Sequence, residues 1–306
     1  MREFVKSLPT SYAAYGVARC PGTCGEFVQG FTSDGCPFHV TLPVNAYSEV
    51  TIWLGEGVES PGALAEYPKL RRAVYRVLEQ HGVVGLEPRA LVKRTLPIGK
   101  GMASSTADIV AAAAATYTAL GRSFTELDLA SIAAGIESSD GVMYAGVCAV
   151  NHRSGQLLGR LADIPVFTVL AVLPPESMDT SSVVLSRRSS AQHTKILAAC
   201  LDQKVSRSAG EWAELATMSA RLNQMDNPNQ IFDALYRVRD ELSPLGFVVG
   251  HTGTVVGLLF EPGGGGEAAA RTARDKIASY LGNKVECRTL RVEPTRSWGT
   301  PLAGVQ

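Results

Sequence analysis

The chain has 306 residues, which is long for one core and typical of two domains of about 150 residues each. Hydrophobic residues make up 45% and charged residues 19%, a composition typical of folded rather than disordered chains. The 29 acidic and 29 basic residues cancel, so no long-range field favours nucleic acid or an anionic membrane as a partner.

The N-terminal stretch "MREFVKSLPTSYAAYG" lacks the apolar core of a signal peptide, and no apolar run reaches the length of about 18 residues that a membrane span needs. We therefore expect a cytoplasmic protein, in which the six scattered cysteines are reduced thiols. Cys20, Cys24 and Cys36 do not have the spacing of a zinc site, even with His39 as a fourth ligand.

The first half of the chain predicts strands followed by helices. The first 60 residues are rich in β-formers broken by Gly and Asp-Gly. Residues 66–81 predict an amphipathic helix, and residues 88–97 a strand. An alanine-rich helix follows over 107–120, and Ser123 with Glu126 has capping-box spacing for a further helix through about Ile136.

The second half predicts helices on an antiparallel sheet. Its expected elements are a strand at 164–175, helices at about 207–224 and 229–242, a strand–loop–strand unit at 246–262, a flexible glycine linker at 263–266 leading into a helix, and a last strand within 284–294. Residues 177–206 are expected to form a mobile lid or a long loop, with His193 as a solvated helix residue. The pattern predicts an α+β protein with domains at 1–162 and 163–306.

The stretch "PIGKGMASST" (97–106) lies between a predicted strand and the alanine-rich helix. Glycines allow a close backbone approach, and a helix N-terminus offers unpaired N–H groups and the positive end of the helix dipole. Together these features are typical of a phosphate site. The residues assigned to it are Pro97, Gly99, Lys100, Gly101, Met102, Ala103, Ser104, Ser105 and Thr106. The spacing is neither that of a Walker loop nor that of a Rossmann turn.

These ten residues closely resemble the Pro-x-Gly-x-Gly-x-x-Ser-Ser loop of the GHMP kinases (galactokinase, homoserine kinase, mevalonate kinase and phosphomevalonate kinase). The resemblance implies a two-domain α+β fold, with an N-terminal domain like ribosomal protein S5 domain 2 and a ferredoxin-like C-terminal domain. It also implies an ATP-dependent transfer of a phosphoryl group to an alcohol, with Mg²⁺ as cofactor.

Two further motifs occur in the order that the family requires. "ARCPGTCGEFVQG" (18–30) resembles the substrate motif around a Pro-Gly turn, and "GHTGTVVG" (250–257) resembles the C-terminal glycine loop that closes over the phosphates. The sequence of the second motif departs from the family's usual Gly-Gly pattern. The resemblance assigns Gly253 and Thr254 to the nucleotide, and His251 and Thr252 to the substrate.

The stretch "GIESSDGVMYAG" (135–146) follows the two helices and supplies two carboxylates. Resemblance to family members in which an aspartate acts as the base assigns this role to Asp140. Glu137 is assigned with Ser105 to Mg²⁺, since two close carboxylates favour a cation between them. Either residue also fits a helix cap or a turn. In the mevalonate branch the metal-binding glutamate lies further upstream, where this chain has Ala130 and Ser131.

The stretch "CPGTCGEFVQG" most resembles the sequences of the L-threonine kinase branch. Enzymes of this branch make O-phospho-L-threonine for the aminopropanol arm of cobalamin. The resemblance implies that the acceptor is L-threonine and that its ammonium and carboxylate contact residues of the N-terminal motif. These candidates are Thr23, Gly25, Glu26, Gln29 and Asn45. Homoserine kinase and an inactive nucleotide-binding sensor are the alternatives. The expected partner is a small molecule, with no nucleic acid and no membrane, and a homodimer is left open.

Overall fold

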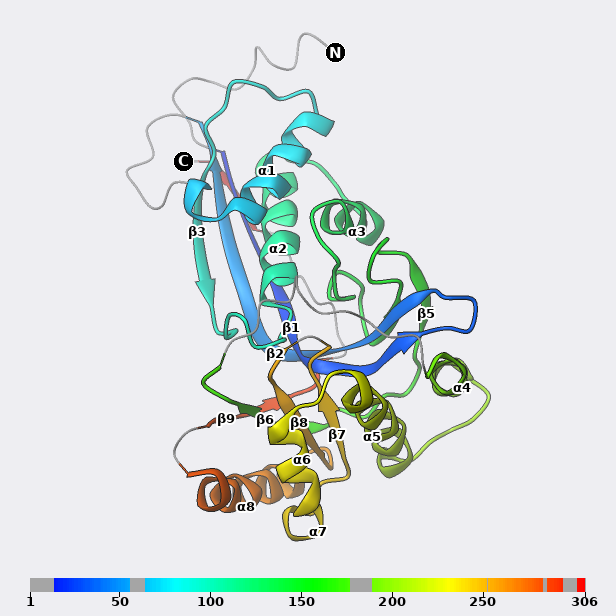
Figure 1. Ribbon diagram of the computed structural model, residues 1–306. Helices are drawn as coiled ribbons and strands as arrows, with labels where there is room; N and C mark the ends of the chain where they lie inside the picture. The colour runs from blue at the N-terminus through cyan, green and yellow to red at the C-terminus, as the bar shows by residue number, and fades with distance from the viewer. Residues whose placement is uncertain are drawn as a thin grey trace.

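The computed structural model describes residues 14–55, 64–176, 189–251, 253–282, 285–293 and 302–305. It shows helices packed on a mixed set of long and short antiparallel strands (Figure 1). Among these residues, strands form one ten-stranded sheet with the main order β5-β4-β2-β1-β7-β8-β6-β9, while β10 pairs with β1 and β3 with β2. No helix in the described ranges is long and apolar enough to cross a membrane.

The strands follow the predicted β-rich segments. Their bounds are β1 Ala14–Phe31, β2 Pro37–Leu54, β3 Arg89–Arg94, β4 Cys148–Val150, β5 Leu157–Arg160, β6 Thr168–Leu173, β7 Gly246–Val249, β8 Val256–Phe260, β9 Glu286–Arg291 and β10 Leu302–Val305. The helices are α1 Pro68–Gln80, α2 Ser104–Ala119, α3 Glu126–Ala134, α4 Ser190–Leu201, α5 Ala209–Asp226, α6 Gln230–Arg237, α7 Arg239–Leu242 and α8 Gly264–Leu281, with a 3₁₀ turn at Leu64–Glu66.

The N-terminal substrate motif lies in a bulged strand rather than in a turn. β1 pairs with β2 along most of its length, but the register shifts between Pro21 and Gly22, between Thr23 and Glu26, and between Glu26 and Val28. Each shift turns the strand locally and re-aims its side chains. The expected Pro-Gly turn is therefore wrong, because this segment continues the sheet while its bulges direct Glu26 inward, where it is buried.

The alanine-rich helix α2 is buried along nearly all its length between the β1–β2 ribbon and α1 (Figure 1). Its small side chains let the strand backbone approach closely. A Cβ at Gly16 of β1 would lie 2.1 Å from the carbonyl oxygen of Ala115. This packing holds the C-terminal end of α2 on β1. At the other end of the helix a Cβ at Gly22 would lie 2.4 Å from the carbonyl oxygen of Met102, so β1 also packs closely against the glycine-rich loop.

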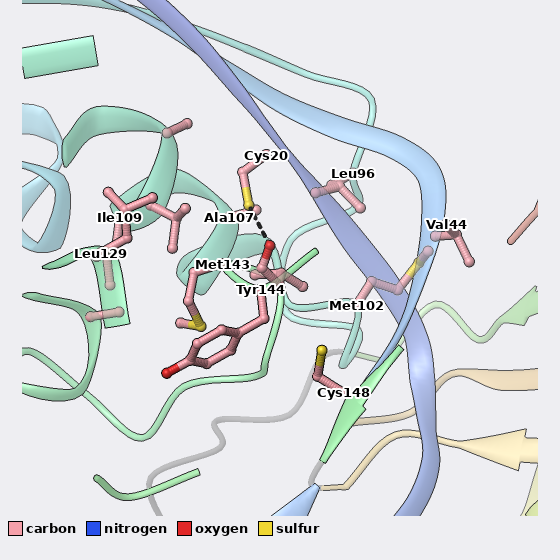
Figure 2. Packing of buried hydrophobic residues seen from close by; sticks show 14 of the residues in the cluster. Cys20, Val44, Leu96, Met102, Ala107, Ile109, Leu129, Met143, Tyr144 and Cys148 are labelled. Carbon is pink, nitrogen blue, oxygen red and sulfur yellow. Dashed lines mark hydrogen bonds between the residues drawn. The ribbon is translucent and has the colours of Figure 1, made fainter. Parts of the chain in front are cut away.

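The core beneath this loop holds side chains from both of the neighbouring motifs (Figure 2). Met102 is 1% exposed and packs among core residues, so it anchors the loop from within. Cys20 is fully buried, and its thiol lies 3.7 Å from the carbonyl oxygen of Val142. All six cysteines are free; burial raises the pKa of Cys24 to about 12 and that of Cys20 well above its usual value.

Several local predictions need correction. The capping box of α3 is formed by Thr125 and Asp128, because Glu126 instead accepts from the backbone N–H of Ala145 and pairs with Arg160. The glycine linker is wrong from residue 264 onward, where helix α8 begins, since packing on β6 and β8 offsets the low helix propensity of glycine.

The segment 177–206 is only partly a loop. Residues 190–201 form α4, and residues 177–188 lie outside the described residues. His193 of α4 is 4% exposed rather than solvated, because its ring packs against Gly30 and its Nδ1 accepts from the backbone N–H of Phe31 at 3.5 Å. A loop prediction based on polar composition missed this contact with a strand far upstream.

The sheet continues across the predicted domain boundary. β1 meets β7 through the pair Glu26–Val249, and β10 returns from the end of the chain to pair with Ala14–Val17. The larger hydrophobic core also includes residues of both halves, whereas a smaller core lies between α6, α8 and the second-half strands. The division at residue 162 therefore stays a prediction.

Candidate active site

The loop between β3 and α2 has an unusual backbone. Gly99 and Gly101 have φ of 71° and 82°, and Ala103 has φ of 56° although it carries a side chain. A left-handed conformation is costly for alanine and is found where the surrounding structure imposes it. No side chain caps α2, so the N–H groups of its first turn keep their hydrogen-bonding capacity for a ligand.

The three sequence motifs meet at this loop. The backbone N–H of Thr23 donates to the carbonyl of Met102 at 3.2 Å, and that of Val255 donates to the carbonyl of Lys100 at 3.0 Å. A Cβ at Gly253 would lie 2.3 Å from the Cα of Gly101. The two glycine loops thus touch backbone to backbone. Sequence order alone predicted their presence but not their contact.

Lys100 is part of the phosphate motif, but its side chain is hydrogen-bonded outside the loop. Its ammonium donates to the carbonyl oxygens of Pro174, Pro175 and Glu176, each at 2.8 Å, just beyond the end of β6. The hydroxyl of Thr254 also donates to the carbonyl of Glu176. In this arrangement Lys100 ties the phosphate loop to the second half of the chain rather than supplying a free cation.

Ser105 and Glu137 share a cation that sequence reasoning missed. The ammonium of Lys69, in the first turn of α1, lies 3.3 Å from the Ser105 hydroxyl and 2.5 Å from a Glu137 carboxylate oxygen. The structure therefore brings both predicted Mg²⁺ ligands to one point. The neighbouring Ser104 is half-buried and Thr106 is buried.

Asp140 lies beside a buried carboxyl group and a histidine. Its Oδ1 accepts from Nδ1 of His39 at 3.1 Å, and the same nitrogen lies 3.9 Å from Glu26 Oε2. The hydroxyl of Thr41 donates to Glu26 at 3.3 Å and accepts from the backbone N–H of Gly141 at 2.8 Å. Burial and the neighbouring charge of Asp140 raise the pKa of Glu26 well above its usual value.

Three histidines gather at the same place. The ring centroids of His39 lie 4.3 Å from those of both His152 and His251. The His251 Nδ1 contacts Oε1 of Gln29 at 2.5 Å, and the Gln29 amide N–H donates to the carbonyl of Val249. Burial lowers the pKa of His39 and of His152 to about 3, and that of His251 well below its usual value.

The other predicted substrate residues are Gly25, Thr23, Asn45 and Thr252, and Asn45 does not join this cluster. Gly25 (φ 71°) packs on the backbone of Val249, and the buried Thr23 hydroxyl has no hydrogen-bond partner among the described residues. Asn45 does not join the cluster, because its side chain is exposed and accepts from the backbone N–H of Arg291. Thr252 lies outside the described residues.

A cleft of about 530 Å³ opens next to the cluster. It extends between the second glycine loop and the connection from α5 to α6, and its lining includes His251, Gly253, Thr254, Asn223 and Asn229. The Asn223 amide donates to Gln29 and that of Asn229 donates to the carbonyl of Thr254. These two asparagines hold the cleft wall, and no local sequence pattern identified them.

Because three buried histidines stay neutral in the folded protein, we expect the free energy of unfolding to fall as the pH is lowered. Below pH 6.5 the unfolded chain takes up protons on these histidines, whereas the folded His39 and His152 stay neutral down to about pH 3, and burial also holds the pKa of His251 well below its usual value. Each shift lowers the free energy of unfolding by about 1.4 kcal/mol per pH unit over that window. Glu26 has a raised pKa, because it is buried beside Asp140, and so its titration acts in the opposite sense.

We expect urea unfolding between pH 7 and 5 to show this slope, and His152→Asn to reduce it by about one proton. His81→Asn is the matched control, because His81 is exposed at the C-terminal end of α1, where its ring contacts Tyr117 and none of the three clustered histidines. Equal slopes for the wild type and His152→Asn would contradict the role of the cluster.

The sequence matches the model described as the GHMP kinases N terminal domain over residues 69–150. It is 32% identical over 259 residues to an L-threonine kinase of Citrobacter freundii, covering 80% of this chain and 86% of that protein. It is 31% identical over 258 residues to an L-threonine kinase of Salmonella typhimurium, covering 80% and 83%.

Solved structures agree in fold. A homoserine kinase from Cytophaga hutchinsonii superposes with a TM-score of 0.64 at 15% identity, covering 97% of this chain and 98% of that one. A Methanococcus jannaschii mevalonate kinase gives 0.64 at 12% identity, covering 90% and 98%. Together with the family model and the two L-threonine kinase relatives, this fold and the glycine loop define a kinase. The chain belongs to the GHMP kinase family, and it is an ATP-dependent kinase that acts on a hydroxyl group. The predictions of family and α+β fold are confirmed.

Proposed function

We propose that this kinase transfers the γ-phosphoryl group of ATP to the side-chain hydroxyl of L-threonine, producing O-phospho-L-threonine. The observation that carries the choice of acceptor is the 32% identity to an L-threonine kinase over 80% of this chain. The product serves the aminopropanol arm of cobalamin, the role that the motif resemblance implies.

The glycine loop is the proposed phosphate site. The first-turn N–H groups of α2 carry no side-chain cap, and Gly99, Gly101 and Ala103 hold the loop in left-handed conformations of the kind found in anion-binding loops. Gly253 and Thr254 contact or adjoin the same loop from the second half of the chain. ATP supplies the phosphoryl group, and the protein contributes the positioning and the electrostatic stabilisation that this chemistry needs.

Ser105 and Glu137 are the proposed ligands of Mg²⁺. Both side chains already contact one cation, the Lys69 ammonium, and a hydroxyl with a carboxylate suits the preference of Mg²⁺ for oxygen. Mg²⁺ held by these two residues would supply charge neutralisation for the phosphate oxygens. Lys69 would provide a further positive charge at the mouth of α2.

Asp140 is the proposed residue that orients or deprotonates the threonine hydroxyl. Its carboxylate accepts from His39 of the histidine cluster and lies beside Glu26 of the substrate motif, and its side chain is 20% exposed. The transfer is direct, and no covalent phosphoenzyme is proposed.

The test is ADP release from MgATP with L-threonine, L-allothreonine, L-serine, L-homoserine, mevalonate and galactose as acceptors. We expect a kcat/KM for L-threonine at least tenfold above every other acceptor. L-allothreonine is the matched control because it differs only in configuration at the hydroxyl-bearing carbon. A preference for L-homoserine would keep the fold and chemistry but replace the acceptor, and ATP binding without turnover would favour a nucleotide sensor.

A further inference from the structure

An ion pair joins the two elements that flank the proposed phosphate loop. Arg94 is the last residue of β3, Asp108 lies in the second turn of α2, and residues 95–103 form the loop between them. The Arg94 Nε donates to Asp108 Oδ1 at 2.8 Å, and its Nη2 donates to Oδ2 at 2.7 Å. Because the flat guanidinium contacts both carboxylate oxygens, the pair fixes the relative direction of strand and helix as well as their separation.

The carboxylate of Asp108 is also held from the sheet. The Ser48 hydroxyl on β2 donates to Oδ1 at 2.5 Å, and Ser48 and Arg94 are paired residues of neighbouring strands. The side chains of Arg94 and Asp108 are only 17% and 16% exposed, so solvent and salt screen this pair less than an ion pair on the surface. The hydrogen bonds to Asp108 raise the pKa of Arg94 and favour its charged form.

Arg94 also contacts the residue that precedes α1. The guanidinium carbon of Arg94 lies 5.3 Å from the centroid of the Tyr67 ring, a cation–π contact. Two residues further along the chain, the Lys69 ammonium contacts Ser105 and Glu137. Arg94 therefore packs between the start of α1 and the start of α2.

The residues of the loop do not by themselves favour its conformation. Ala103 has φ of 56°, which is unfavourable for a residue with a side chain, and α2 begins without a side-chain cap. The surrounding structure must therefore impose this conformation. Within the described ranges, Asp108 is the residue of α2 whose side chain is hydrogen-bonded to the sheet. The pair with Arg94 is thus the direct side-chain link between the strand and the helix on either side of the loop.

We propose that Arg94 and Asp108 are positioning residues for nucleotide binding, and that their ion pair holds the phosphate loop in the conformation that receives the phosphates of ATP. This inference rests on the proposed phosphate site and adds to it two residues outside the glycine motif. Neither side chain needs to touch the nucleotide. The pair keeps β3 and α2 at a fixed separation, and so keeps the N–H groups of the loop and of the first helical turn in place.

The first experiment measures the dissociation constant of ADP in the presence of Mg²⁺ by calorimetry, for the full chain and three variants. Asp108→Asn keeps the shape of the side chain but removes its charge. Arg94→Met keeps an unbranched apolar stem beside Tyr67 but removes the guanidinium, and the third variant combines both changes. We expect the dissociation constant to rise at least tenfold in each single variant. Because both side chains act through one contact, the double variant should bind no more than about threefold more weakly than the weaker single variant.

Three results of this titration contradict the proposal. An unchanged dissociation constant in Asp108→Asn would overturn it. Losses that multiply in the double variant would overturn it too, because the two residues would then act separately. Tighter binding in Asp108→Asn would mean that Arg94, once released, binds the phosphates directly and does not position the loop. If Asp108→Asn does not fold, Ser48→Ala takes its place, since it removes one hydrogen bond to the same carboxylate. We expect a rise of about threefold there, and no rise would overturn the proposal.

Steady-state kinetics separate positioning of the loop from a general loss of structure. We expect the KM for ATP to rise at least tenfold in Asp108→Asn, while the KM for the preferred acceptor stays within about twofold. Equal rises in both KM values, together with a lower temperature of thermal unfolding, would mean that the pair only stabilises the fold. Arg94→Lys tests the geometry, because lysine keeps the charge but cannot contact both carboxylate oxygens in a fork, and we expect it to recover only part of the ATP affinity.

Two further variants serve as controls. Glu126→Gln breaks a comparable ion pair with Arg160, between α3 and β5, and should leave the dissociation constant of ADP within about twofold. Gly101→Ala distinguishes this inference from the proposed phosphate site. If Gly101→Ala leaves ADP binding unchanged, the phosphate site is wrong and the inference falls with it. If Gly101→Ala weakens ADP binding and Asp108→Asn does not, the site stands and only the role of the ion pair is wrong.

Discussion

Replacing Asp140 with asparagine is expected to lower kcat for the preferred acceptor by about two to four orders of magnitude, the usual contribution of a general base. Asparagine has nearly the same shape and can still accept from the His39 Nδ1 through its carbonyl oxygen. It cannot take a proton from the acceptor hydroxyl, and it removes the negative charge next to Glu26. The KM for ATP should stay within about twofold, because no hydrogen bond or ion pair joins Asp140 to the phosphate loop in the described part of the chain.

Asp128→Asn is the matched control for this substitution. Asp128 accepts from the backbone N–H and the hydroxyl of Thr125 in the capping box of α3, remote from the three motifs. Its replacement should lower the free energy of unfolding by about 1 kcal/mol and leave kcat unchanged. If Asp140→Asn keeps more than a tenth of the wild-type kcat, the residue acts by positioning alone, and the assignment as a base is wrong.

Gly101→Ala is expected to lower kcat/KM for ATP at least a hundredfold. Gly101 has φ of 82°, and a Cβ there would lie 2.7 Å from the Cα of Gly253. The neighbouring atoms are backbone atoms, so the two glycine loops must separate to admit the methyl group. That separation moves the N–H groups proposed to bind the phosphates, and a misplacement of about 1 Å is enough to cost a hundredfold in rate.

Gly121→Ala separates this effect from backbone strain. Gly121 also has positive φ, 62°, but a Cβ at that position meets nothing within 4 Å. Its replacement should cost about 1 kcal/mol of stability, as the left-handed conformation of alanine does, without changing kcat/KM. Thermal unfolding and steady-state kinetics on both variants separate the effect of the contact between the loops from the effect of backbone strain. Equal kinetic losses in the two would mean that the contact between the loops has no functional role.

The contacts of two lysines, Lys100 and Lys69, follow from the tertiary structure and not from their places in the sequence. Lys100 stands inside the phosphate motif, yet its long side chain reaches three carbonyl groups beyond the end of β6. Lys69 stands in an ordinary amphipathic helix, 36 residues before Ser105 and 68 before Glu137, and its ammonium lies between them. Position in a motif predicts where a backbone goes, but a flexible side chain bonds wherever the folded chain offers acceptors.

The sequence by itself determined the family, the α+β class and the order of most elements. It did so because hydrophobic period, glycine and proline positions and helix-capping residues act over a few neighbouring residues. The phosphate loop is recognisable for that reason: its glycines, hydroxyls and following helix are contiguous in the chain.

Only the tertiary structure decided what surrounds Asp140. His39 lies 101 residues before it, and Gln29 lies 222 residues before His251, so no local pattern relates them. Their meeting depends on the bulges of β1 and on the pair between Glu26 and Val249 that joins the strands of the two halves. Burial then lowers the pKa of His39, His152 and His251 and favours their neutral forms. This desolvation exists only in the folded protein, so the sequence alone does not reveal it.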